Sequence, residues 1–108
     1  MTTYYYLLAS ERFLTEEEAM DEVLQERLRN YQDQGKTIDF WFISQPAFLE
    51  SSAFAVIKAK CPQPAAALVS TNPQFIQWLK LRLEYVLTGE FEAPTAEIPD
   101  ALASLTAV

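Results

Sequence analysis

The sequence contains no histidine, one cysteine and only two glycines. Without imidazole, the chain cannot build a histidine-based zinc site, a Ser-His or Cys-His nucleophile pair, or a histidine general base. The single thiol, Cys61, rules out an internal disulfide and fits a reducing compartment. Both glycines, Gly35 and Gly89, directly follow predicted helices, so none remains for a phosphate-cradling loop. We therefore expect a protein that is not an enzyme, with no catalytic residues, no cofactor and no metal site.

Carboxylates are the remaining candidates for a metal site, and their spacing does not favour one. Glu16, Glu17 and Glu18 are adjacent on a predicted helix. Successive helical side chains point in different directions and cannot converge on one ion. These acids suit instead the first turn of a helix, where the helix dipole favours negative charge.

Positive charge is scarce, because 8 Lys and Arg stand against 15 Asp and Glu, for a net charge of −7. This balance argues against non-specific binding to nucleic acid and against electrostatic docking to anionic lipid. No apolar run approaches the length of a membrane span, and the N-terminal one lacks the basic region of a signal peptide. The composition predicts one globular domain over residues 1–93, followed by a loosely ordered tail over 94–108.

The most strongly patterned stretch runs from Asn72 to Gly89. Asn72 is a favourable N-cap, Pro73 fits the first helical position, and Gly89 is placed as a C-terminal stop, so the sequence predicts a helix over 73–88. At 100° per residue one face gathers the core-facing side chains, which are Phe75, Ile76, Leu79, Leu83, Val86 and Leu87.

Trp78, Leu81 and Tyr85 extend this apolar arc past half of the circumference. Arg82 falls inside the extended arc, four residues from Trp78 and close enough to stack on the indole. One interpretation is a long side chain that covers apolar surface and pairs with an acid. The other is an interface anchor, since Arg, Trp and Tyr are enriched at the centres of binding surfaces.

A second long helix is predicted over 15–34, opened by a capping box of Thr15 and Glu18 and closed by Gly35. Arg27 lies in the middle of its buried stripe, and we interpret it as reaching past the core edge to an acid.

Strands are predicted over residues 3–9, 37–44 and 65–71, and residues 53–59 are ambiguous between strand and helix, with strand preferred. Both faces of the first two strands are apolar, apart from Asp39. That acid is interpreted either as a charge near the start of its strand or as part of a charged spot beside Arg82.

The order of elements predicts a compact single α+β domain, with a mostly antiparallel sheet of three to four strands flanked by the two main helices (15–34 and 73–88). Two helices do not cover every apolar face, so some aromatic surface should remain for a partner or ligand.

Several long strings then carry a family resemblance. They are YYYLLASERFLTEEE, RNYQ, IDFWFI, PAFLE, IKAKCPQPAAALVSTN and QFIQWLKLRLEYVLTGEFEAP. Over roughly residues 2–94 the chain resembles the small accessory subunit of the aerobic magnesium-protoporphyrin IX monomethyl ester cyclase, a conserved reading-frame family of cyanobacteria and plastids.

The resemblance implies a non-catalytic subunit of chlorophyll biosynthesis that binds and stabilises the membrane-bound catalytic diiron subunit. The expected location is the cytoplasmic side of a cyanobacterial thylakoid membrane or the plastid stroma, with membrane association through the partner. The family's functional surface maps onto Asp39, Phe40 and Arg82. Together with the neighbouring Trp78 and Tyr85, these are the predicted partner-binding residues.

An alternative is a carrier whose aromatic face holds a tetrapyrrole substrate or product, with Arg82 pairing a propionate carboxylate. The lack of histidine removes the usual axial ligand of a bound metal and weakens this alternative. Direct catalysis comes third, since nothing in the sequence suits two irons.

Overall fold

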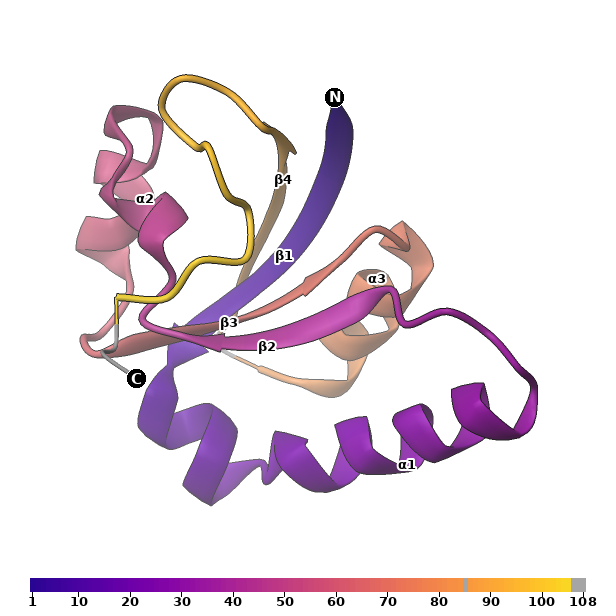
Figure 1. The fold of residues 1–108 in the computed structure, drawn as a ribbon. Helices are drawn as coiled ribbons and strands as arrows, with labels where there is room; N and C mark the ends of the chain where they lie inside the picture. Colours follow the sequence, from indigo (N-terminus) through magenta and orange to yellow (C-terminus); the bar gives the residue numbers. More distant parts are fainter. Residues whose placement is uncertain (85, 106–108) are drawn as a thin grey trace.

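The computed structural model describes residues 1–84 and 86–105. Four strands, β1 (Thr2–Ser10), β2 (Phe40–Ser44), β3 (Ala65–Ser70) and β4 (Leu87–Ala93), form one antiparallel sheet in the order β2-β3-β1-β4 (Figure 1). The first strand is therefore an inner strand, as its two apolar faces predict. The α+β class and the antiparallel sheet are confirmed.

The helical elements are two longer helices and a group of short ones. The longer helices are α1 (Met20–Asp33) and α3 (Pro73–Arg82). The short ones are a π-helical turn η1 (Phe13–Glu17), the 3-10 turns η2 (Ala47–Glu50) and η3 (Ser52–Phe54), and α2 (Ala55–Lys60).

The sheet separates two hydrophobic clusters, because successive side chains of a strand point to opposite faces. On one face Leu7 and Leu68 pack with residues of α1 and α3, including Tyr31 and Phe75. On the other face the covering layer is made by η2, η3, α2 and the chain after β4, which Figure 1 shows across the sheet from α1 and α3. This second layer covers the surface that two helices alone could not.

The helix predicted over 73–88 is shorter than expected and ends at Arg82. Leu83 already has an extended backbone (φ −112°, ψ 147°). The residues from Leu87 onward pair with β1 instead. Gly89 is therefore no helix stop but a strand residue opposite Tyr6. As a strand, β4 gives the backbone N–H and C=O groups along one edge of β1 their hydrogen-bond partners. A further turn of α3 could not do this.

The helix predicted over 15–34 begins later, at Met20. The π-helical turn comes first, and Ala19 then takes a left-handed conformation (φ 46°) that separates the two segments. Thr15 does not form the predicted capping box, because its hydroxyl donates to the Glu11 carbonyl at 2.8 Å. The predicted end is confirmed, since Gly35 follows the helix with φ 67°.

The strand preferred over 53–59 is wrong, because this segment is helical in η3 and α2. Phe54 is buried in the core while Val56 is 68 % exposed. Four other segments supply the strands of the sheet, and this segment instead packs Phe54 into the core from a helical backbone, so tertiary packing here outweighs its β propensity.

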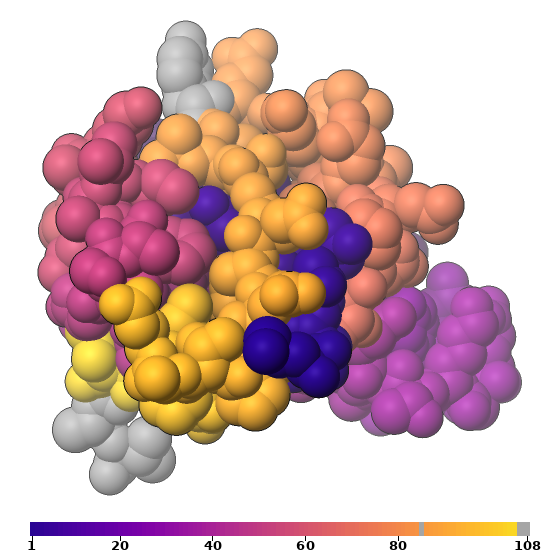
Figure 2. Space-filling view, turned by 90° about the horizontal axis from the view of Figure 1, so that it is seen from above, coloured from indigo at the N-terminus to yellow at the C-terminus, as the bar shows by residue number. Residues whose placement is uncertain are grey.

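Residues 94–105 lie over the face of the sheet that η2, η3 and α2 also cover. Ile98 and Ala101 are buried in the cluster that contains Phe48, and Leu105 donates its backbone N–H to the Gln45 carbonyl at 2.8 Å. How loosely this segment is held in solution stays a prediction. In the space-filling view it lies beside the N-terminal residues and the segment that contains α2 (Figure 2).

Candidate functional site

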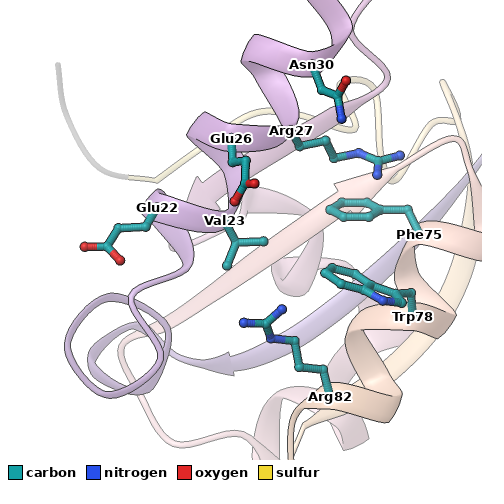
Figure 3. Close-up of a pocket in the computed structure, with 8 residues that line it drawn as sticks. All are labelled: Glu22, Val23, Glu26, Arg27, Asn30, Phe75, Trp78 and Arg82. Carbon is teal, nitrogen blue, oxygen red and sulfur yellow. The ribbon is translucent and has the colours of Figure 1, made fainter.

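A groove of about 470 Å³ lies between α1 and α3 on one face of the molecule. Figure 3 shows its two walls, with the acidic and amide side chains on α1 and the two aromatic rings on α3. Its lining consists of Glu22, Val23, Glu26, Arg27, Asn30, Phe75, Trp78 and Arg82.

Two guanidinium groups and two aromatic rings form one continuous stack along this groove (Figure 3). The Arg27 guanidinium carbon lies 3.9 Å from the centroid of the Phe75 ring. Phe75 and Trp78 stack with centroids 6.3 Å apart and planes at 19°, and the Arg82 guanidinium carbon lies 5.4 Å from the Trp78 ring. The predicted stacking of Arg82 on Trp78 is confirmed.

The start of α3 sets the direction of this stack. The Asn72 side chain accepts a hydrogen bond from the Gln74 N–H at 3.0 Å, and Pro73 follows as the first helical residue. The fixed start turns Leu79 into the core at 0 % exposure, while Trp78 remains 48 % exposed. Sequence position thus decides which apolar residues of the helix pack inside and which line the groove.

The α1 wall arises from the helical repeat. Glu22, Glu26 and Asn30 are spaced by four residues, so they lie along one side of the helix. Val23 and Arg27 form the adjacent row with the same spacing. The groove therefore has carboxylates on its α1 rim and arginine side chains at its two ends.

A hydrogen-bonded chain runs beneath the groove from Asp39, the residue before β2, through Tyr31 to Arg27 on α1. The Tyr31 hydroxyl donates to Asp39 Oδ1 at 2.9 Å and accepts from Arg27 Nη2 at 2.8 Å. Burial, and the hydrogen bond to Asp39, raise the pKa of Tyr31, and the nearby Arg27 opposes this only in part. Tyr31 therefore stays protonated at neutral pH and can keep donating to the carboxylate.

The structure distributes the predicted partner-binding residues unevenly. Arg82 and Trp78 line the groove, and Asp39 joins the chain beneath it. Phe40 is only 6 % exposed, so it can support a binding surface but offers little surface itself. Tyr85 lies outside the described residues. Their part in partner binding stays a prediction.

The expected charged spot of Asp39 beside Arg82 is not formed as an ion pair. Among the carboxylates that the structure describes, none pairs with the Arg82 guanidinium, and Asp39 is joined to Tyr31 instead. Within residues 1–84 and 86–105, Arg82 therefore lacks the acidic partner that the first interpretation of this residue required. Its charge remains available to a binding partner.

Sequence reasoning missed the α1 wall of the groove. Arg27 was interpreted as reaching for an acid, whereas it lies over Phe75 and reaches Asp39 only through the Tyr31 hydroxyl. The position of Arg27 inside the apolar stripe of its helix was the one sequence feature that could have pointed to this wall. Glu22 and Glu26 gave none, because exposed helical acids are common on any soluble helix.

The arrangement is suited to binding. Its exposed indole and its two stacked guanidinium groups offer apolar area together with positive charge, beside the carboxylates of the α1 rim, so the groove presents a surface of mixed character to a binding partner. In residues 1–84 and 86–105, no group of three His, Cys, Asp or Glu side chains could hold a metal ion. No helix within those ranges is long and apolar enough to cross a membrane.

Comparison with known proteins places this chain in a family. A sequence profile described as Ycf54 protein matches residues 2–93. A Ycf54-like protein of Synechocystis sp. is 62% identical over 105 residues, which cover 97% of this chain and 79% of that protein. Protein YCF54, chloroplastic, of Arabidopsis thaliana is 43% identical, with 95% of this chain and 47% of that protein covered. An X-ray structure of the All0216 protein from Nostoc sp. PCC 7120 superposes with a TM-score of 0.96 at 68% identity, covering 97% of both chains. The chain therefore belongs to the Ycf54 family, whose members occur in cyanobacteria and in plastids.

Proposed function

We propose that this domain is a non-catalytic accessory subunit that binds and stabilises the catalytic diiron subunit of the magnesium-protoporphyrin IX monomethyl ester oxidative cyclase. The observation that supports a docking role is the stacked pair of Trp78 and Arg82 at the end of α3. The identity of the partner rests on the family resemblance of the sequence.

The exposure of this pair favours protein binding. Trp78 is 48 % exposed and its neighbour Leu81 is 78 % exposed. Tryptophan and arginine are among the residue types enriched at the energetic centres of protein interfaces. A partner that binds only in its folded form is stabilised by such docking, because binding draws the folding equilibrium toward the complex. The domain needs no catalytic group to act in this way.

Location follows from the partner in this proposal. The domain would associate with the cytoplasmic face of the thylakoid, or the stromal face in a plastid, through the membrane-bound diiron subunit. Its net charge of −7 disfavours a direct attraction to anionic lipid.

A tetrapyrrole carrier is the second candidate, and the groove itself favours it. Its volume of about 470 Å³ falls in the range of small-molecule sites, and Arg27 and Arg82 could pair with propionates. Glu22 and Glu26 on the opposite rim would repel those carboxylates. Protein docking is therefore the better supported function.

The test is a pull-down with the tagged protein from detergent-solubilised thylakoid membranes, with proteins and pigments both analysed. Wild type is compared with Arg82→Ala and with the matched control Lys80→Ala, which removes the same charge from the exposed side of the same helix. We expect wild type and the control to recover the diiron subunit, and Arg82→Ala to recover at least about fivefold less, the change that corresponds to about 1 kcal/mol.

Two results would contradict the docking proposal. Equal recovery of the diiron subunit by Arg82→Ala and wild type would remove Arg82 as an anchor. Recovery of a tetrapyrrole without the diiron subunit would support the carrier instead.

A further inference from the structure

Asp39 is held firmly at the end of the sheet where α1 and α3 meet. Its backbone carbonyl accepts hydrogen bonds from the Ser70 hydroxyl at 2.7 Å and from the Thr71 N–H at 3.1 Å. Its side chain accepts from the Tyr31 hydroxyl. Asp39 thus connects the end of β3 with the last turn of α1.

Tyr31 transmits this connection to the groove. Its hydroxyl is the hydrogen-bond partner of Arg27 Nη2, and the buried Nε atom of Arg27 has no partner among the described residues. The guanidinium otherwise rests on aromatic rings, 3.9 Å from the centroid of Phe75 and 5.4 Å from that of Phe40. The direction of the Arg27 side chain therefore depends on the Tyr31 hydroxyl.

The helix α1 has few other fixed points. Its buried residues are Met20 near one end and Tyr31 near the other. Between them, Val23, Leu24 and Leu28 are only partly buried. One side of the helix borders the groove, and the other borders a second hollow of about 210 Å³. The anchoring of Tyr31 therefore has a large influence on where α1 lies relative to α3.

We propose that Tyr31 and Arg27 are positioning residues and that Asp39 acts on the binding surface through them. The chain Asp39–Tyr31–Arg27 fixes the α1 wall against Phe75, which keeps the neighbouring Trp78 and Arg82 in their stack. This proposal rests on the proposed docking function, because it assigns the way in which Asp39 supports that surface. Direct contact between Asp39 and the partner is the opposing explanation.

The first test measures recovery of the diiron subunit in the same pull-down. Tyr31→Phe removes the hydroxyl but keeps the ring, and Asp39→Ala removes the acceptor. We expect each to reduce recovery by a similar factor, about fivefold, and the double variant to be no worse than either single one, since both break one chain. Asp39→Asn should retain most of the recovery, because its amide oxygen can still accept from Tyr31. Wild-type recovery by Tyr31→Phe together with a loss in both Asp39 variants would overturn the proposal and favour direct contact.

The second test needs no partner. The chain has two tryptophans, and in a Trp41→Phe background the fluorescence reports on Trp78 alone. We expect Tyr31→Phe and Asp39→Ala to shift the emission to longer wavelength as the stack loosens, and Asp39→Asn to leave it unchanged. Unchanged emission in the first two variants would overturn the positioning role. If Tyr31→Phe lost its native circular dichroism, the pair Asp39→Ala and Asp39→Asn would decide the question.

The two proposals fail differently. If Arg82→Ala binds the diiron subunit as wild type does, the docking function fails while the fluorescence result still reports on the chain beneath the groove. If Arg82→Ala loses binding but Tyr31→Phe changes neither binding nor fluorescence, only the positioning role fails.

Discussion

Gly89 lies directly opposite Tyr6 in the sheet, and the aromatic ring of Tyr6 occupies the space that a side chain at position 89 would need. A Cβ atom on residue 89 would lie 2.7 Å from Tyr6 Cζ and closer still to the hydroxyl oxygen. The ring is enclosed by Phe48 and Phe54, each with its centroid 5.6 Å away, so it cannot swing aside easily. The glycine is required here for close approach.

Gly89→Ala should therefore destabilise the protein although alanine generally suits a strand no worse than glycine. We expect a loss of about 1–3 kcal/mol in the free energy of unfolding, typical of overpacking, measured by urea denaturation. The double variant with Tyr6→Leu should recover part of this loss relative to Tyr6→Leu alone. An unchanged unfolding midpoint for Gly89→Ala would contradict the close approach.

The rotation of α3 can be tested with two leucines of the same helix. Leu79 is fully buried, whereas Leu81 is 78 % exposed. We expect Leu79→Ala to reduce the free energy of unfolding by about 2–5 kcal/mol and Leu81→Ala to change it by less than about 0.5 kcal/mol. Equal losses for the two variants would show that the helix is turned differently.

Phe40 should affect binding through stability. Its ring meets Tyr31 edge-on, with centroids 5.3 Å apart, and lies 5.7 Å from Phe75. Phe40→Ala is expected to cost about 3–5 kcal/mol of unfolding free energy, and Phe40→Leu clearly less. Thermal unfolding followed by circular dichroism gives the measurement. A Phe40→Ala variant with wild-type stability and lost binding would instead place this residue at the partner's surface.

Alkaline pH should weaken the fold. Burial raises the pKa of the Tyr6 hydroxyl and the Cys61 thiol, and burial together with the Asp39 hydrogen bond raises the pKa of Tyr31. The folded state then holds these protons more tightly than the unfolded state. Their contribution to stability is complete below the unfolded pKa values, about 8.5 for cysteine and about 10 for tyrosine, and is lost as the pH rises through the folded values.

Urea denaturation at a series of pH values between about 8 and 11 measures this loss. Tyr31→Phe should show a shallower decline than wild type, because one of the titrating groups is gone. A free energy of unfolding that does not fall over this range would contradict the raised pKa values.

The sequence was sufficient to predict a structural feature where local chemistry and hydrophobic periodicity agree. The inner strand that contains Tyr6 was predicted from its two apolar faces, and the start of α3 from Asn72 and Pro73. The contact between Arg82 and Trp78 followed from their spacing of four residues. Each of these features needs information from only a few neighbouring positions.

The end of α3 could not be predicted in the same way. Leu83 and Leu87 fit the apolar face of a longer helix as well as they fit the chain that leads into β4. The choice is made by β1, which is far away in the sequence and offers a free edge for pairing. Tertiary pairing here outweighs local helix propensity.

In the groove too, features set by one segment could be predicted and features set by contacts between distant segments could not. The α3 wall was found from one helix, but the contact of Arg27 with Phe75 joins two elements that are distant in the sequence. The chain of Tyr31 and Asp39 likewise depends on how α1 crosses the end of β2. No periodicity within either segment carries that information.

The central place of β1 has a consequence for how the protein is made. The first strand synthesised pairs with β3 and with β4, the last strand of the sheet. While the ribosome is still adding residues 65–93, the two hydrogen-bonding edges of β1 lack their partner strands, and the sheet cannot close. Such non-local pairing slows folding and leaves hydrophobic surface exposed to aggregation or to chaperones during synthesis.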